Sequence, residues 1–303
     1  ILSLNVFANW VPGTFNSWNT NTPMSETNMP LGFKKFTTLT SDDQQFQILK
    51  TGSWNDGGWG SGYWINSWNT VWNLPFTGTN MANSVVKSFG TNQYMSIVTS
   101  SGLTDVTSKF GFLITRSLPI YISAVSGGTT NVALNTSVAI SITLSAEKSI
   151  DEYVLIRYTT DNWSTSGFVT ATGSGTSYSA TIPGQTSNKT VKWYAMTSTI
   201  ENPVTDTDYL TLCVMDNSRN NYSYYAGETS STHYFRSKVT GNWNTAGNLE
   251  SSDNGSSNWI TATQVPGSSA AGITILNGHN ITLNTDVTIT SLTINSGATF
   301  TAS

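Results

Sequence analysis

The stretch from residue 54 to residue 72 reads WNDGGWGSGYWINSWNTVW and concentrates side chains that can stack on flat rings. It holds five tryptophans and one tyrosine, separated mainly by Gly, Asn and Ser, with one acid and no base. A core element would set these rings among aliphatic residues, but Ile65 and Val71 are the only ones present. Indole and phenol rings offer large apolar faces while their polar groups still need partners. The pattern is typical of a surface that stacks on sugar rings, with Asn and Asp binding the hydroxyl groups.

This stretch and one later turn supply the candidate ligand-binding residues. In the turn, Asp161-Asn162-Trp163 would offer a tryptophan beside polar neighbours. Three alternatives stay open. The rings of the first stretch pack beneath their own loop, or they contact another protein. Trp163 folds back onto the sheet from a hairpin tip. Trp59, Tyr63 and Trp64 have the closest flanking glycines and are the first to test. The full set of candidates is Trp54, Asn55, Asp56, Trp59, Tyr63, Trp64, Trp68 and Trp163.

Other chemistry-bearing residues favour structural roles. Trp193 and Tyr194 are neighbours on one predicted strand, so we expect them on opposite faces, one in the core and one exposed. Cys213 lies in the apolar alternation YLTLCV and reads as a small buried hydrophobe. The only two histidines, His233 and His279, are far apart in the sequence and lack metal-ligand spacing.

Acidic pairs do not point to catalysis. Asp206 and Asp208 alternate near a proline, so a calcium site there is an alternative to solvated charges. A glycosidase pair assembled from distant acids is a second alternative. Without clustered acids, bases or nucleophiles, the sequence predicts no enzyme, no cofactor and no metal.

Composition narrows the class of protein. Charged residues make up only 10% of the 303 residues, against roughly 25% in an ordinary soluble domain. The net charge of −4 with 13 basic residues argues against a nucleic-acid partner. No apolar run is long enough to span a membrane. Surfaces rich in Ser, Thr, Asn and Gly suit secreted β proteins, so we expect an extracellular or cell-surface location.

The elements that must position these residues are strands. Apolar residues recur with a period of two, and turn signals such as PG, NDGG and SGG separate the runs. The sequence therefore predicts an all-β protein. The expected strands cover residues 2–8, 46–49, 95–98, 110–114, 138–144, 153–158, 177–182, 191–197 and 209–214.

Three regions differ in pattern. Residues 1–117 predict an aromatic-rich β-sandwich, and residues 118–226 predict an immunoglobulin-like sandwich with regular strand spacing. Residues 227–303 contain a polar linker followed by short apolar pairs, which are typical of the first rungs of a β-solenoid or β-helix. This pattern reaches Ser303 without a polar cap, which predicts either further rungs or a covering chain.

Several motifs carry a family resemblance. Arg157 to Trp163 reads RYTTDNW and resembles the immunoglobulin-like starch-binding modules of large secreted proteins from Bacteroidetes-type bacteria. Residues 13–19, GTFNSWN, are similar to the opening of modules attached to α-glucan enzymes and surface starch binders. Residues 235–238 and 241–243, with Asn277-Gly278-His279, resemble the entry to β-helical regions of such proteins. The resemblance implies secreted or surface-exposed, non-catalytic modules.

These observations lead to two functional hypotheses. The first is non-catalytic binding of an α-glucan-like or other polysaccharide, or of a cell-surface glycan. The second is a structural subunit of an extracellular filament or adhesin, which would self-associate through strand contacts or the solenoid end.

Overall fold

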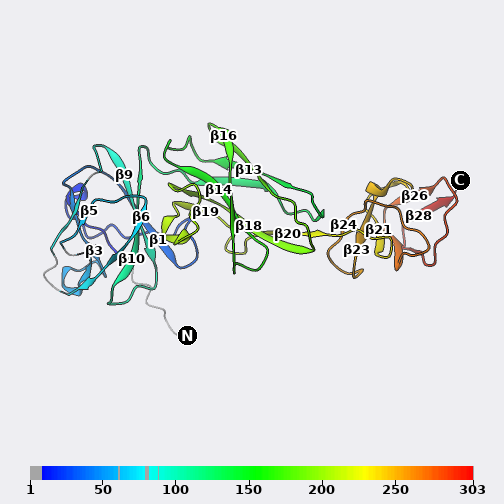
Figure 1. The fold of residues 1–303 in the computed structure, drawn as a ribbon, viewed down its shortest axis with the longest axis horizontal. Coiled ribbons are helices and arrows are strands. Elements are labelled where there is room, and N and C mark those ends of the chain that lie inside the picture. Colours follow the sequence, from blue (N-terminus) through cyan, green and yellow to red (C-terminus); the bar gives the residue numbers. More distant parts are fainter. Residues whose placement is uncertain (1–8, 61, 79–81, 88, 303) are drawn as a thin grey trace.

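The computed structural model describes residues 9–60, 62–78, 82–87 and 89–302. Within these residues the chain is all-β: it forms strands and four short 3-10 turns but no α-helix. None of the described residues forms a helix long and apolar enough to cross a membrane. Three groups of sheets follow one another along the long axis, from the blue N-terminal end to the red C-terminal end (Figure 1).

The N-terminal group has one antiparallel sheet of four strands and two small sheets of three strands. Phe110 and Phe112 of the large sheet meet Phe46 and Trp59 of the small sheets in a common core. Aromatic rings thus fill much of the space that aliphatic side chains fill elsewhere. The large sheet has the order β1 (Phe33–Thr40), β9 (Gln93–Ser100), β10 (Ser108–Thr115) and β6 (Thr70–Leu74). The small sheets are β2 (Gln45–Phe46), β8 (Ser84–Val86) and β5 (Trp64–Ile65), and β3 (Ile48–Leu49), β4 (Gly58–Trp59) and β7 (Phe76–Thr77), with turns η1 (Thr14–Asn16) and η2 (Trp54–Asp56).

The central group consists of two sheets that share one aliphatic core. Strict alternation places Ile140 and Ile142 toward Val154 and Ile156 of the opposite sheet. Trp193 lies in this core, and its Nε1 donates to the carbonyl of Gly128 at 2.7 Å. One sheet has the order β11 (Ile122–Gly127), β13 (Val138–Leu144), β17 (Ser177–Ile182) and β16 (Thr172–Ser174). The other has the order β12 (Val132–Ala133), β20 (Tyr222–Gly227), β18 (Lys189–Ser198), β14 (Tyr153–Thr159) and β15 (Gly167–Thr170), with β19 (Cys213–Met215) paired to β18 and turn η3 (Thr207–Leu210) nearby.

The C-terminal group contains two ladders with parallel pairs. Thr274 pairs with Thr293 in one ladder, and Ile281 pairs with Phe300 in the other. The paired residues are therefore separated by the same number of sequence positions in both ladders. Phe235, Ile273 and Ile275 point into the core between them. The first ladder is β24 (Ile260–Thr261), β23 (Leu249–Ser252), β21 (Tyr234–Ser237), β25 (Gly272–Ile275) and β27 (Thr293–Ile294). The second is β22 (Gly241–Asn242), β26 (Asn280–Leu283) and β28 (Thr299–Ala302), with turn η4 (Ala246–Asn248).

The N-terminal and central groups are packed tightly together. Val98 and Leu113 of the large N-terminal sheet share a buried cluster with Leu212. The Lys35 ammonium donates to the carbonyl of Leu212, and desolvation by burial lowers the pKa of this lysine. A Cβ on Gly111 would lie 1.8 Å from the backbone oxygen of Tyr209, so only glycine permits this approach.

The strand predictions meet different outcomes. Residues 138–144 and 177–182 form strands with the predicted bounds, whereas residues 209 and 210 belong to turn η3 and the strand begins only at Cys213. The prediction for residues 2–8 lies entirely outside the described residues. Trp193 and Tyr194 lie on opposite faces as expected, but both are buried, because a second apolar cluster covers the outer face of the sheet. The expectation that one of the two is exposed was therefore wrong.

Candidate functional site

The turn after β14 holds Trp163 in an unusual backbone conformation. Asn162 and Trp163 have φ angles of 58° and 72°, in the left-handed region that a bulky residue seldom adopts. Asp161 stabilises the turn, because its Oδ1 accepts from the Thr165 amide at 2.9 Å and its Oδ2 from the Thr165 hydroxyl at 2.6 Å. The Trp163 amide donates to Thr159 Oγ1 at 3.0 Å. Local hydrogen bonds thereby fix the backbone that carries the indole.

Arg157 connects this tryptophan to the face of the sheet. Its guanidinium carbon lies 5.4 Å from the ring centre of Trp163 and 5.9 Å from that of Tyr194. Arg157 Nη1 donates to the Tyr194 hydroxyl at 2.9 Å and pairs with Asp208 at 3.5 Å, while Nε donates to Ser166 at 3.0 Å. Cation–π contacts of this kind contribute about 0.5–2 kcal/mol depending on exposure. The side chains of Arg157, Trp163 and Tyr194 therefore form one cluster.

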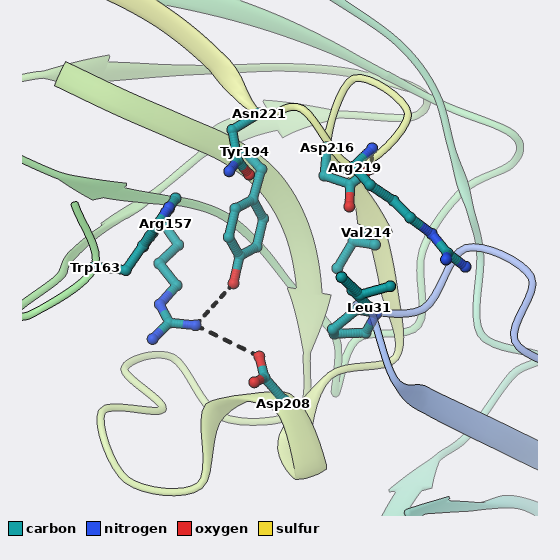
Figure 2. Close-up of a pocket in the computed structure, with 10 residues that line it drawn as sticks. Leu31, Arg157, Trp163, Tyr194, Asp208, Val214, Asp216, Arg219 and Asn221 are labelled. Carbon is teal, nitrogen blue, oxygen red and sulfur yellow. Dashed lines mark hydrogen bonds and ion pairs between the residues drawn. The ribbon is translucent and has the colours of Figure 1, made fainter. Parts of the chain in front are cut away.

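A cavity of about 340 Å³ opens beside these side chains. Figure 2 shows Arg157 and Tyr194 between Trp163 on one side and Val214, Leu31 and Arg219 on the other. We call this cavity the Trp163 pocket. Its lining comes from strands β14, β18 and β19, turn η3 and two loops of the central group, and from a loop of the N-terminal group. The lining residues are Pro30, Leu31, Arg157, Trp163, Tyr194, Asp208, Val214, Asp216, Arg219 and Asn221.

The charges of the Trp163 pocket are balanced. Its lining includes two arginines, Arg157 and Arg219, and two aspartates, Asp208 and Asp216. Burial raises the pKa of Tyr194 to about 12, so the phenol stays protonated at neutral pH. Because its oxygen accepts from Arg157, its own hydrogen can be donated to an acceptor. Burial also raises the pKa of Asp208, which the neighbouring Arg157 opposes. The pocket thus combines donors, acceptors and aromatic surface without an excess of either sign.

Two of the predicted binding residues pack in or against the N-terminal core. Trp59 is 1% exposed, packs against Phe76 and Phe110, and donates its Nε1 to the carbonyl of Val106 at 3.0 Å. Trp68 packs edge-on against Phe89 and donates its Nε1 to the carbonyl of Lys87 at 2.9 Å. The Trp59 ring and its N–H are both used inside the protein, so Trp59 is not available to stack on a sugar. The prediction was wrong for Trp59, because the N-terminal core uses tryptophan where aliphatic residues are scarce. Trp68 is half-buried, and its binding role stays a prediction.

The other predicted residues of the stretch are at the surface but are divided between elements. Trp54, Asn55 and Asp56 form η2, and Trp54, which is 43% exposed, lies 6.1 Å from the ring of Trp18. Tyr63 and Trp64 are 39% and 65% exposed, and Trp64 belongs to strand β5 with the Lys87 ammonium 5.4 Å from its ring centre. The structure therefore separates the single predicted platform into two small exposed groups.

Most residues of the Trp163 pocket were missed by sequence reasoning. Arg157 lies on the same face of strand β14 as the buried Leu155. A charged residue on an apolar face is the sequence signal that could have indicated an arginine packed against aromatic rings. Asp216, Arg219 and Leu31 carry no comparable signal, because the fold brings them to Trp163 from distant parts of the chain. Of the calcium candidates, Asp206 pairs with Lys109 at 2.6 Å and Asp208 with Arg157. Among the described residues, no group of three or more His, Cys, Asp or Glu side chains is arranged to hold a metal ion.

No protein-family model matches the chain, and a search of curated proteins found no significant match.

Proposed function

We propose that the chain is a non-catalytic carbohydrate-binding protein of the cell surface or extracellular space, and that its Trp163 pocket binds a neutral polysaccharide. The observation that carries the proposal is the fixed Trp163 turn beside a pocket with balanced charge. The resemblance of the RYTTDNW motif to starch-binding modules makes an α-glucan the first ligand to test.

The aromatic part of the Trp163 pocket supports a sugar ligand. Ligand sites commonly combine apolar and aromatic surface with a few well-placed polar groups. Trp163 and Tyr194 have ring centres 5.2 Å apart and planes tilted by 41°, so they form a bent aromatic wall. Because local hydrogen bonds fix the Trp163 turn, little rotational freedom is lost on binding. A sugar ring would bury its C–H groups against this wall.

The polar part supports a neutral ligand over a charged one. An anion would meet Asp208 and Asp216, and a cation would meet Arg157 and Arg219. Hydroxyl groups can both donate to the carboxylates and accept from the guanidinium groups. Asn221 adds an amide that offers both functions. This mixture favours a polyhydroxylated, uncharged molecule.

We propose binding without hydrolysis because both carboxylates already have partners. Asp208 is paired with Arg157, and Asp216 Oδ1 accepts from the Arg219 amide at 3.0 Å. A glycosidase needs one carboxylic acid that delivers a proton and a second carboxylate that acts on the sugar or on water. The partners of Asp208 and Asp216 favour structural and binding roles.

The proposal is tested by titrating the chain with maltooligosaccharides and with a panel of other neutral oligosaccharides in a calorimeter. We expect binding by the unmodified chain and a loss of about tenfold or more in affinity for Trp163→Ala, which corresponds to about 1.4 kcal/mol. Trp163→Phe keeps an aromatic face and should retain part of the affinity. Circular dichroism would establish that both variants are folded.

Trp64→Ala is the matched control, because it removes an exposed tryptophan outside the pocket. Its affinity should equal that of the unmodified chain. An absence of binding across the whole panel, or equal affinities for Trp163→Ala and the unmodified chain, would overturn the proposal.

A second candidate function is assembly into a filament or adhesin, and the C-terminal ladders favour it. Strands β27 and β28 are the last of their ladders within the described residues, and Ile294 is exposed on β27. We propose that these edges would accept strands of another copy, as the rungs of a β-solenoid do. Negative-stain microscopy and sedimentation should then show filaments that Ile294→Lys abolishes, whereas a monomer at high concentration would contradict assembly.

A further inference from the structure

A second aromatic cavity lies on the outer face of the C-terminal ladder β21–β25–β27. It has a volume of about 430 Å³, which is within the range of about 300–1,000 Å³ typical of ligand sites. Tyr234 and Trp259 contribute rings, and Ser256, Thr274 and Thr293 contribute hydroxyl groups. We call this cavity the Tyr234 groove. It shares no residue with the Trp163 pocket.

Two glycines leave room for the Tyr234 ring. A Cβ on Gly255 would lie 2.8 Å from Cγ of Tyr234, and one on Gly272 would lie 3.1 Å from its Cδ1. Gly255 also has a φ angle of 71°, a conformation that a side chain would strain. Tyr234 is nevertheless 40% exposed, so part of its ring faces solvent. The two glycines therefore lie close to the ring, and the ring stays partly exposed.

The loop that carries Gly255 is fixed by its own side chains. Asn254 Oδ1 accepts from the amides of Ser256 and Ser257, both at 2.9 Å. The amide of Gly255 donates to Ser252 Oγ at 3.1 Å. This is the same device that Asp161 provides for the Trp163 turn: a short polar side chain caps nearby backbone amides. Both cavities are thus bordered by a loop that is ordered before any ligand arrives.

Arg236 packs against Trp259, the second ring of the groove, and its charge is balanced by Glu250. Its guanidinium carbon lies 4.2 Å from the ring centre of Trp259. Its Nε and Nη2 both lie 2.8 Å from Glu250 Oε2, which neutralises the charge. This geometry leaves the Nη1 end of the fork pointing away from Glu250, where it can donate to a ligand oxygen.

The ladder adds hydroxyl groups in register. Arg236 pairs with Thr274, and Thr274 pairs with Thr293, so the three side chains form a row across the strands. Neighbouring strands lie about 4.8 Å apart, which gives the row a regular spacing. Their neighbours Phe235 and Ile273 point into the core, so the row faces outward. A chain of sugar units laid across the ladder would meet a polar group at each strand.

We infer that the Tyr234 groove is a second carbohydrate site, specific for an uncharged glycan that stacks on Tyr234 and is hydrogen-bonded by Arg236 and the threonine row. The neutral Arg236–Glu250 pair disfavours charged ligands, and the hydroxyl row disfavours a purely apolar one. With two independent sites, the chain would bind one long polysaccharide at two places and gain avidity without new contacts.

The test titrates the full chain with short neutral oligosaccharides and follows tryptophan indole N–H signals by nuclear magnetic resonance, with Trp259→Phe used to assign the Trp259 signal. We expect Trp163→Ala to leave a saturable shift of the Trp259 signal. Adding Tyr234→Ala should weaken that remaining binding by about tenfold or more. Tyr121→Ala removes another exposed tyrosine and is the matched control, with no change expected.

The outcomes separate the two sites. If Trp163→Ala abolishes all glycan binding and Tyr234→Ala changes nothing, the proposed function stands and this inference is overturned. If residual binding in Trp163→Ala is removed by Tyr234→Ala, this inference stands whatever the fate of the Trp163 pocket. A Trp259 signal that responds to peptides and not to any glycan would also overturn it.

Discussion

The stretch 54–72 and the turn 161–165 both display tryptophan, but they use it in different ways. In the first, Trp59 is buried in the N-terminal core and Trp68 packs against that core. In the second, a single Trp163 is held in a left-handed turn and packs with Arg157 beside an open pocket. This difference shows that a high density of aromatic residues can indicate a core that is built from rings because aliphatic residues are scarce. A binding role is indicated better by how one ring is fixed and what surrounds it.

The largest expected effect tests the structural half of this comparison. Trp59→Ala removes a fully buried ring and leaves the carbonyl of Val106 without its donor. We expect a loss of about 3–5 kcal/mol in the free energy of unfolding, measured by chemical denaturation. Trp163→Ala should cost far less stability, because its ring is only half-buried. Equal losses for the two variants would contradict the division between core and site.

A smaller effect concerns the hydrogen bonds that fix the Trp163 turn. The hydroxyl and amide of Thr165, followed by the Thr159 hydroxyl, lower the pKa of Asp161 to about 2 from 3.8. A lowered folded-state pKa gives stability that is present above about pH 3.8 and is lost as the pH falls through about 2. We expect the fluorescence of Trp163, isolated by difference against Trp163→Phe, to stay constant from pH 8 to pH 4 and to change only below that.

Asp161→Asn is the control for this pH dependence. This variant should lack the acidic transition. Its affinity for glycan should be lower than that of the unmodified chain and higher than that of Trp163→Ala. A transition of the same size in Asp161→Asn would show that another group controls the turn.

The smallest expected effect tests the exposed remainder of the first stretch. Trp64→Ala should change the free energy of unfolding by less than about 0.5 kcal/mol, as for most surface substitutions. Denaturation of this variant beside Trp59→Ala would measure how unequal two neighbouring tryptophans are. A loss comparable with that of Trp59→Ala would mean that Trp64 contributes to the core after all.

Sequence patterns predicted the fold where one face of a strand is buried. Residues 138–144 alternate strictly between buried and exposed, and the predicted strand has the observed bounds. Strand β1 was missed because Lys34 and Lys35 stand where a buried strand would have apolar residues. The Lys34 side chain is nevertheless buried, and burial lowers its pKa to about 8. Local sequence patterns do not predict a buried lysine.

Of the candidate site, the sequence predicted only the turn that carries Trp163. The spacing of Asp161, Asn162 and Trp163 indicates a polar turn that carries an indole, and this much is visible in the sequence. Leu31 reaches the Trp163 pocket through the packing of the N-terminal group against the central group, and Arg219 reaches it from the loop after β19. In the Tyr234 groove, the glycines beside the Tyr234 ring come from two separate segments. Sequence spacing does not encode either juxtaposition.

The tight contact at Gly111 has a consequence for cooperativity. The backbone of Tyr209 rests directly on Gly111, and Lys35 donates to Leu212 across the same boundary. Separating the two groups would hydrate a shared apolar cluster and break these contacts together, so we expect them to unfold in one transition. The Trp163 pocket takes Leu31 from one group and Tyr194 from the other. An occupied pocket would therefore raise the melting temperature of both groups at once, by mass action on a single folding unit.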